Sequence, residues 1–146
     1  MIGWRARLGF LVPPGNPTVE TEMIAMAPPG VSLHFHRMVA HGTPGSLVGQ
    51  SERNRSMVDN IDSGIENIYD TTAEDAYRLA RMVDTEDAEA VFLSGTGMPT
   101  VSVLEALEQD LGKPVLSSAS AMMWHALRLA GVGQAITGYG RLLTLR

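Results

Sequence analysis

The 146-residue sequence contains no cysteine. Disulfides, thiolate metal sites and cysteine nucleophiles are therefore excluded, because each needs the sulfur of that side chain. Aromatic residues make up only 5% of the chain. No apolar run approaches the roughly 20 residues of a transmembrane helix, and the N-terminus lacks the apolar stretch of an export signal. We therefore expect a cytoplasmic protein without a membrane partner.

Positive charge is also scarce. Eleven Lys and Arg residues stand against 16 Asp and Glu, which gives a formal net charge of −5, and the basic residues are scattered along the chain. A nucleic-acid partner requires a concentrated basic surface that neutralises phosphates. The sequence therefore predicts no nucleic-acid binding.

Hydrophobic residues are plentiful, at 45% of the chain. A chain of this length buries roughly two thirds of its unfolded surface, which is enough for a core of its own. We expect residues 1–146 to form a single α/β domain.

Apolar patterns alternate between strand and helix along the chain. The strand patterns cover residues 8–12, 31–39, 90–94 and 113–117. The helical patterns cover residues 19–26, 51–68, 72–83, 102–111 and 120–129, and a tail from Gly133 to Arg146 is irregular. Right-handed crossovers between such strands predict a doubly wound parallel sheet of about four strands, in the flavodoxin-like order 2-1-3-4.

Ligands of open parallel sheets bind beyond the carboxyl ends of the strands. The rule selects the loops that follow the predicted strands, and these loops carry small or polar residues. The candidate binding residues are Pro14, Asn16, Gly95, Thr96, Gly97, Ser117 and Ser118. Backbone N–H groups near a glycine turn and hydroxyls at a helix start favour a small anion, whereas the purely local interpretation is turn formation and helix capping.

Other polar residues are interpreted as structural. His34 and His36 share one strand face and could bind a metal with His41, but no carboxylate or cysteine accompanies them at informative spacing. We interpret them as solvent-facing and expect no metal. Glu22 is placed near a helix start, where it favours the helix dipole, and Glu108 on a solvated helix face.

Several strings in combination resemble a known family. They are GFLVPPGNPTVE at 9–20, FLSGTG at 92–97, LGKPVLSS at 111–118, LRLAG at 127–131 and GYGRL at 138–142. Together they are similar to the maleate isomerase and arylmalonate decarboxylase branch of the aspartate/glutamate racemase superfamily. The resemblance implies a two-lobed ancestor of which this chain holds the start of one lobe and the end of the other.

The resemblance also implies where substrate would bind. Asn16 falls on the family's substrate-binding asparagine, and Thr96, Gly97 and Ser118 are carboxylate-binding candidates. The family's catalytic cysteine, however, falls on Gly95, which has neither a proton to give nor a lone pair to attack with. No catalytic residue is therefore assigned.

Three hypotheses follow. The first is an isomerase-like or decarboxylase-like protein that recognises a small carboxylate or dicarboxylate, with little or no thiol-dependent catalysis. The second is a catalytically silent binding or partner protein of the same fold. The third, a flavodoxin-like cofactor module, lacks loop aromatics that would sandwich a flavin, so we expect no cofactor.

A lone lobe leaves a face uncovered, which predicts a homodimer.

Overall fold

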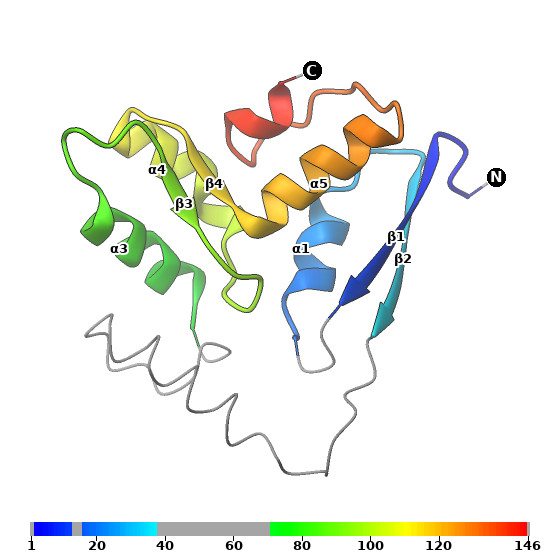
Figure 1. Ribbon diagram of the computed structural model, residues 1–146, viewed down its shortest axis with the longest axis horizontal. Coiled ribbons are helices and arrows are strands. Elements are labelled where there is room, and N and C mark those ends of the chain that lie inside the picture. The colour runs from blue at the N-terminus through cyan, green and yellow to red at the C-terminus, as the bar shows by residue number, and fades with distance from the viewer. Residues whose placement is uncertain (1, 13–15, 38–70, 146) are drawn as a thin grey trace, which may run out of the picture.

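The computed structural model describes residues 2–12, 16–37 and 71–145 (Figure 1). Its strands are β1 (Ala6–Val12), β2 (Val31–Arg37), β3 (Val91–Leu93) and β4 (Val115–Ser117). Its α-helices are α1 (Val19–Met26), α3 (Ala73–Val83), α4 (Leu104–Leu111) and α5 (Ser118–Leu129). Two 3₁₀ turns, η2 (Val101–Val103) and η3 (Arg141–Thr144), complete it. Pro14 and the helix expected over 51–68 lie outside the described residues.

The strands pair in parallel, as their alternation with helices predicts. β1 pairs with β2, and β3 pairs with β4. Both pairs are neighbours in the expected order 2-1-3-4. The single four-stranded sheet is not found among the described residues, which instead form two two-stranded sheets. Helices α1 and α5 pack against each other, and Figure 1 draws them between the two strand pairs.

The β1–β2 pair is buried on one face only. Leu8 and Val12 point into the core, and the rings of Phe10 and Phe35 stack with centroids 5.7 Å apart on the same side. Leu11 lies on the opposite face and is 72% exposed. The apolar run of residues 8–12 is typical of a buried strand, but β1 is buried on one face only, and no described helix covers its outer face.

One apolar cluster joins the helices to both strand pairs. Its fully buried members include Met23 and Met26 of α1, Met123 and Leu127 of α5, and Leu104 of α4. Side chains from β1, β3 and β4 enter the same cluster. Burial of apolar surface in this cluster therefore holds the two strand pairs together without hydrogen bonds between them.

Helix boundaries follow local sequence signals. Thr72 and Asp75 form a capping box at the start of α3, where the Thr72 side chain accepts a hydrogen bond from the Asp75 N–H. Gly112 ends α4 in the left-handed conformation, with φ of 69°. Each of these two signals indicates a helix end, because it supplies a hydrogen-bond partner or a backbone conformation that a helix end needs.

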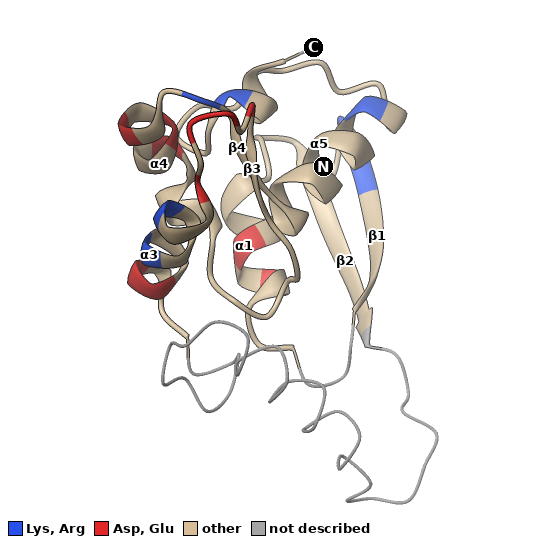
Figure 2. Ribbon diagram, turned by 60° about the vertical axis from the view of Figure 1, so that its left-hand side comes forward, with Lys and Arg blue, Asp and Glu red and all other residues tan. Residues whose placement is uncertain are grey.

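Charged side chains gather on α3 and α4, whereas α5 carries a single charged residue near its C-terminal end (Figure 2). Glu108 of α4 departs from this surface pattern because it is buried. One of its carboxylate oxygens accepts the Val115 N–H at 3.0 Å, and the other accepts the Arg141 N–H at 2.8 Å. The interpretation of Glu108 as part of a solvated face is therefore wrong, since its carboxylate ties β4 and the C-terminal segment to α4.

The C-terminal segment is held at two further points. Tyr139 donates its hydroxyl hydrogen to the Ala25 carbonyl at 2.9 Å, and the buried Leu143 enters the core.

None of the helices in the described part of the chain has the length and apolar character that crossing a bilayer requires.

Candidate functional site

Asn16 connects the start of α1 with the loop that follows β3. Its side-chain oxygen accepts hydrogen bonds from the N–H groups of Thr18 and Val19, at 2.9 and 3.1 Å. Its side-chain amide donates to the Thr96 hydroxyl at 2.8 Å. Only 3% of the residue is exposed. Asn16 therefore satisfies two backbone N–H groups at the start of α1 and fixes the position of Thr96 at the same time.

A second contact joins the same two segments. The Thr18 hydroxyl donates to the Gly97 carbonyl at 2.8 Å. Two adjacent residues of the loop, Thr96 and Gly97, are thus each held by a side chain from the α1 start. A loop with two such anchors has less conformational freedom to lose when it binds a ligand.

The loop is also joined to α5. The Gly95 N–H donates to the Ser118 hydroxyl oxygen at 3.0 Å. The Ser118 hydroxyl hydrogen is not used in that bond, so it can be donated elsewhere. Gly95 has φ of 90°, and apart from its two chain neighbours no heavy atom of the described residues lies within 4 Å of the place where a Cβ would project. The position is roomy, but an L side chain there would adopt a strained backbone conformation.

Ser117, the residue before Ser118, has a different role. Its hydroxyl oxygen accepts the Ser120 N–H at 3.2 Å, and the Ser120 hydroxyl oxygen accepts the Ser117 N–H at 2.9 Å. Both serines are buried. This reciprocal pair is a capping box for α5, so the geometry favours the local interpretation of Ser117 and leaves Ser118 as the serine at the candidate site.

The structure therefore brings together five of the seven predicted residues, namely Asn16, Gly95, Thr96, Gly97 and Ser118. The N-terminal ends of α1 and α5 both reach this loop, and helix N-termini favour negative charge. Among the hydrogen bonds within the described residues, none uses the N–H groups of Thr96 or Gly97. These donors and the Ser118 hydroxyl suit a small anion.

Sequence reasoning missed Glu22, which packs beside this loop. The side chain is only 6% exposed, and one oxygen accepts the N–H groups of Thr100 and Val101, the latter at 2.8 Å. Burial raises the pKa of the Glu22 carboxyl, and the bonds from Val101 and Thr100 partly offset that effect. Its spacing from Val19, three residues along the same helix face, was the available signal of burial.

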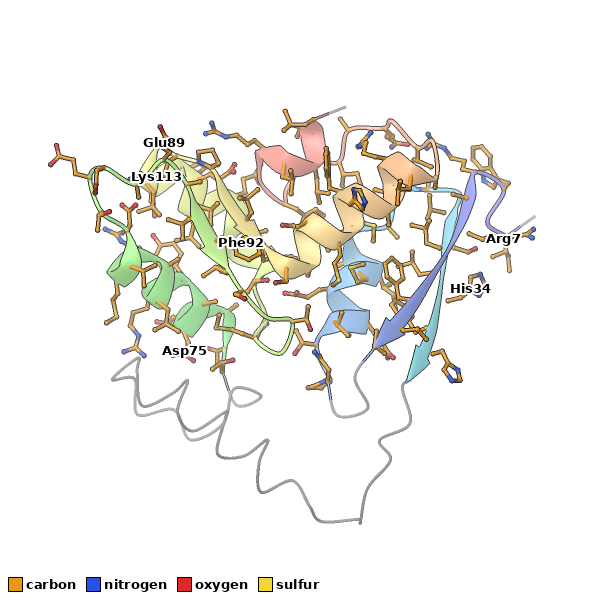
Figure 3. All side chains as sticks on the ribbon, viewed as in Figure 1. Arg7, His34, Asp75, Glu89, Phe92 and Lys113 are labelled. Carbon is orange, nitrogen blue, oxygen red and sulfur yellow. The ribbon has the colours of Figure 1, made fainter. Side chains whose placement is uncertain are left out.

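The two strand histidines lie away from this loop. His34 and His36 are exposed on the outer face of β2, and a ring nitrogen of His34 is 3.1 Å from the Ser32 hydroxyl oxygen. Figure 3 shows Arg7 and His34 pointing away from α1 and α5. No group of three or more metal-ligating side chains occurs within 2–12, 16–37 and 71–145.

Residues 51–143 match the profile of a protein family described as arylmalonate decarboxylase. A curated arylmalonate decarboxylase from Bordetella bronchiseptica is 46% identical over 57 residues, which are 38% of this chain and 24% of that protein. A maleate isomerase from Nocardia farcinica is 27% identical over 140 residues, which are 95% of this chain and 53% of that protein. The chain thus spans about half the length of the curated maleate isomerases it matches.

The fold is shared with solved structures. A mutant of the Nocardia farcinica maleate cis-trans isomerase, with a covalently bound succinylcysteine intermediate, superposes with a TM-score of 0.70 at 19% identity. That alignment covers 94% of this chain and 98% of the other. In the sequence alignment with the curated Nocardia farcinica maleate isomerase, the 140 aligned residues make up only 53% of the isomerase. A maleate isomerase from Pseudomonas putida S16 with maleate also has a TM-score of 0.70, at 16% identity over 94% of this chain and 97% of that one.

Proposed function

The chain belongs to the arylmalonate decarboxylase family, and on this premise we propose that it recognises a small carboxylate or dicarboxylate at the loop between β3 and η2. The observation that carries the proposal is that Asn16 and Ser118, from two other segments of the chain, meet this loop at Thr96 and at Gly95. The names of its relatives suggest the ligand class, since maleate and arylmalonates are both small dicarboxylates.

Neutral donors would hold the carboxylate. The N–H groups of Thr96 and Gly97 and the hydroxyl of Ser118 are positioned by the contacts with Asn16, Thr18 and Gly95. Hydrogen bonds to a charged group contribute roughly 1.5–3 kcal/mol each. The N-terminal ends of α1 and α5 add a favourable potential at the same place.

We propose that thiol-dependent turnover is negligible. The Nocardia farcinica relative carries a succinylcysteine intermediate, whereas the present chain has no cysteine, and the family resemblance implies that Gly95 occupies the position of the thiol. Because glycine supplies neither a nucleophile nor a proton, the thiol step has no counterpart here. This same observation favours the alternative function, a catalytically silent binding or partner protein of the family fold.

Ser118→Ala is expected to raise the Kd for malonate and maleate by about tenfold or more, since one charge-assisted hydrogen bond is lost. Calorimetric titration of the purified protein measures both dissociation constants. Ser102→Ala, which changes an exposed serine of η2, is the matched control and should leave them unchanged. Equal affinities for Ser118→Ala and the unaltered protein, or no binding of either acid at millimolar concentration, would contradict carboxylate recognition here.

We also propose that the chain forms a homodimer. The outer face of β1 and β2 has no described helix over it, and a hollow of about 350 Å³ lies there beside Gly9, Leu11 and His36. Exposed apolar surface is commonly covered by a partner, and two identical copies can bury the same patch across a two-fold axis.

Light scattering over an about tenfold dilution tests the dimer, because association depends on protomer concentration. A mass near twice 15.7 kDa is the expected result. A mass of 15.7 kDa at every concentration would contradict the dimer.

A further inference from the structure

Glu22 holds the far end of the same loop that Asn16 and Thr18 hold at its near end. Its carboxylate accepts the backbone N–H of Val101 at 2.8 Å and that of Thr100, and it lies within 3.4 Å of the Thr100 hydroxyl. Asn16 and Thr18 bind Thr96 and Gly97. One face of the α1 start therefore fixes the loop at two places, at Thr96–Gly97 and at Thr100–Val101.

A buried carboxylate at position 22 is unfavourable for the stability of the fold. Glu22 is surrounded by apolar neighbours on α1, such as Val19, Met23 and Met26, which are fully or almost fully buried. Removing a charge from water is unfavourable, and an apolar side chain of similar volume is often at least as stabilising. A carboxylate oxygen, however, accepts two converging N–H groups, which no apolar side chain does.

We propose that Glu22 is a positioning residue for the candidate site, fixing the loop so that the N–H groups of Thr96 and Gly97 face the bound carboxylate. The inference rests on the proposed function, since it assigns Glu22 a role in ligand affinity without contact to the ligand. The role is geometric, because the glutamate holds the backbone at Thr100 and Val101 while the ligand meets residues three to five positions earlier.

Glutamine provides a close test of this geometry. Both N–H bonds reach the same oxygen of Glu22, and a glutamine oxygen in that place accepts both. The glutamine amide nitrogen then faces the Thr100 hydroxyl, which can accept a hydrogen bond. Glu22→Gln therefore keeps the loop contacts, whereas Glu22→Ala removes them, and Glu22→Asp withdraws the carboxylate by one methylene.

The experiment compares these variants with Glu108→Ala, which removes another buried carboxylate that accepts backbone N–H groups but binds other segments. Affinities for malonate and maleate are measured by calorimetry at a temperature where circular dichroism shows each variant folded. Glu22→Ala is expected to raise Kd about tenfold, while Glu22→Gln and Glu108→Ala stay within about threefold of the unaltered protein. If Glu22→Ala does not fold, Glu22→Asp takes its place with a smaller loss of affinity in the same direction.

Two results would overturn the positioning role: unchanged affinity in Glu22→Ala or its aspartate substitute, or an equal loss in Glu108→Ala. If the unaltered protein binds neither acid, the proposed function fails and amide hydrogen exchange decides the positioning role separately. Faster exchange at Thr96 and Gly97 in Glu22→Ala, absent from Glu22→Gln and Glu108→Ala, would support it. Equal protection of those amides in all four proteins would refute it.

Discussion

Leu127→Ala is expected to lower the free energy of unfolding by about 3 kcal/mol, within the range of roughly 2–5 kcal/mol for buried leucines. Leu127 lies on α5, is fully buried and belongs to the cluster that also contains Met23 and Met26 of α1. The truncation leaves a cavity where α5 meets the rest of that cluster. Urea unfolding followed by circular dichroism measures the change.

Leu129→Ala is the matched control on the same helix. This leucine is 77% exposed, so its truncation removes little buried surface and should change stability by less than about 0.5 kcal/mol. A similar loss in both variants would contradict core packing as the cause, because only Leu127 is buried and alanine has a higher helix propensity than leucine. Equal stability of Leu127→Ala and the unaltered protein would contradict the packing of α5 into the core.

Glu108→Ala is expected to destabilise the fold by about 3 kcal/mol, because two backbone N–H groups lose their acceptor and each unpaired buried group costs roughly 1–3 kcal/mol. The groups are those of Val115 and Arg141. Gly140 also packs closely here, since an added Cβ would lie 3.3 Å from the Glu108 carboxyl carbon. Thermal and urea unfolding both report the loss.

Glu105→Ala supplies the comparison, as Glu105 lies one turn earlier on α4 and is exposed. Its removal should change stability by less than about 0.5 kcal/mol. The stability of Glu108→Gln should lie between those of Glu105→Ala and Glu108→Ala. Glutamine offers one acceptor oxygen, whereas Val115 and Arg141 use two. Matching stabilities for Glu105→Ala and Glu108→Ala would mean that the Glu108 carboxylate is not a structural clamp.

Local signals in the sequence predict much of the secondary structure. The capping box of Thr72 and Asp75 marks the start of α3, and the Pro28–Gly30 turn separates α1 from β2. β3 and β4 are shorter than their apolar patterns, with three residues each, because only those residues pair across the two strands. Apolar patterning predicts which segments are buried, but strand pairing determines where each strand ends.

The candidate site was predictable to a similar extent. The strand-end rule selects the loops of Asn16, Thr96 and Ser118 correctly as neighbours, since parallel strands end at a common edge. The separate roles of Ser117 and Ser118 were also readable, because Ser117 and Ser120 have capping-box spacing.

The partners of the buried carboxylates were beyond such reasoning. Glu22 and Glu108 have the charge and the helical setting of surface residues, and their partners are backbone N–H groups, which every residue except proline carries. The bond from Val101 to Glu22 joins residues 79 positions apart. No sequence pattern at either end identifies the other, so only the folded arrangement reveals the pair.

The packing of α1 against α5 also bears on how the chain reaches its native state. Asn16 and Thr96 are 80 residues apart, and Tyr139 bonds to Ala25 across 114 residues. Contacts of such high sequence separation slow folding, because the entropy of closing long loops is lost before the contacts compensate for it. During synthesis α1 leaves the ribosome well before α5, and the apolar face of Met23 and Met26 is not fully covered until α5 follows. The nascent chain is therefore expected to depend on chaperones more than its length alone suggests.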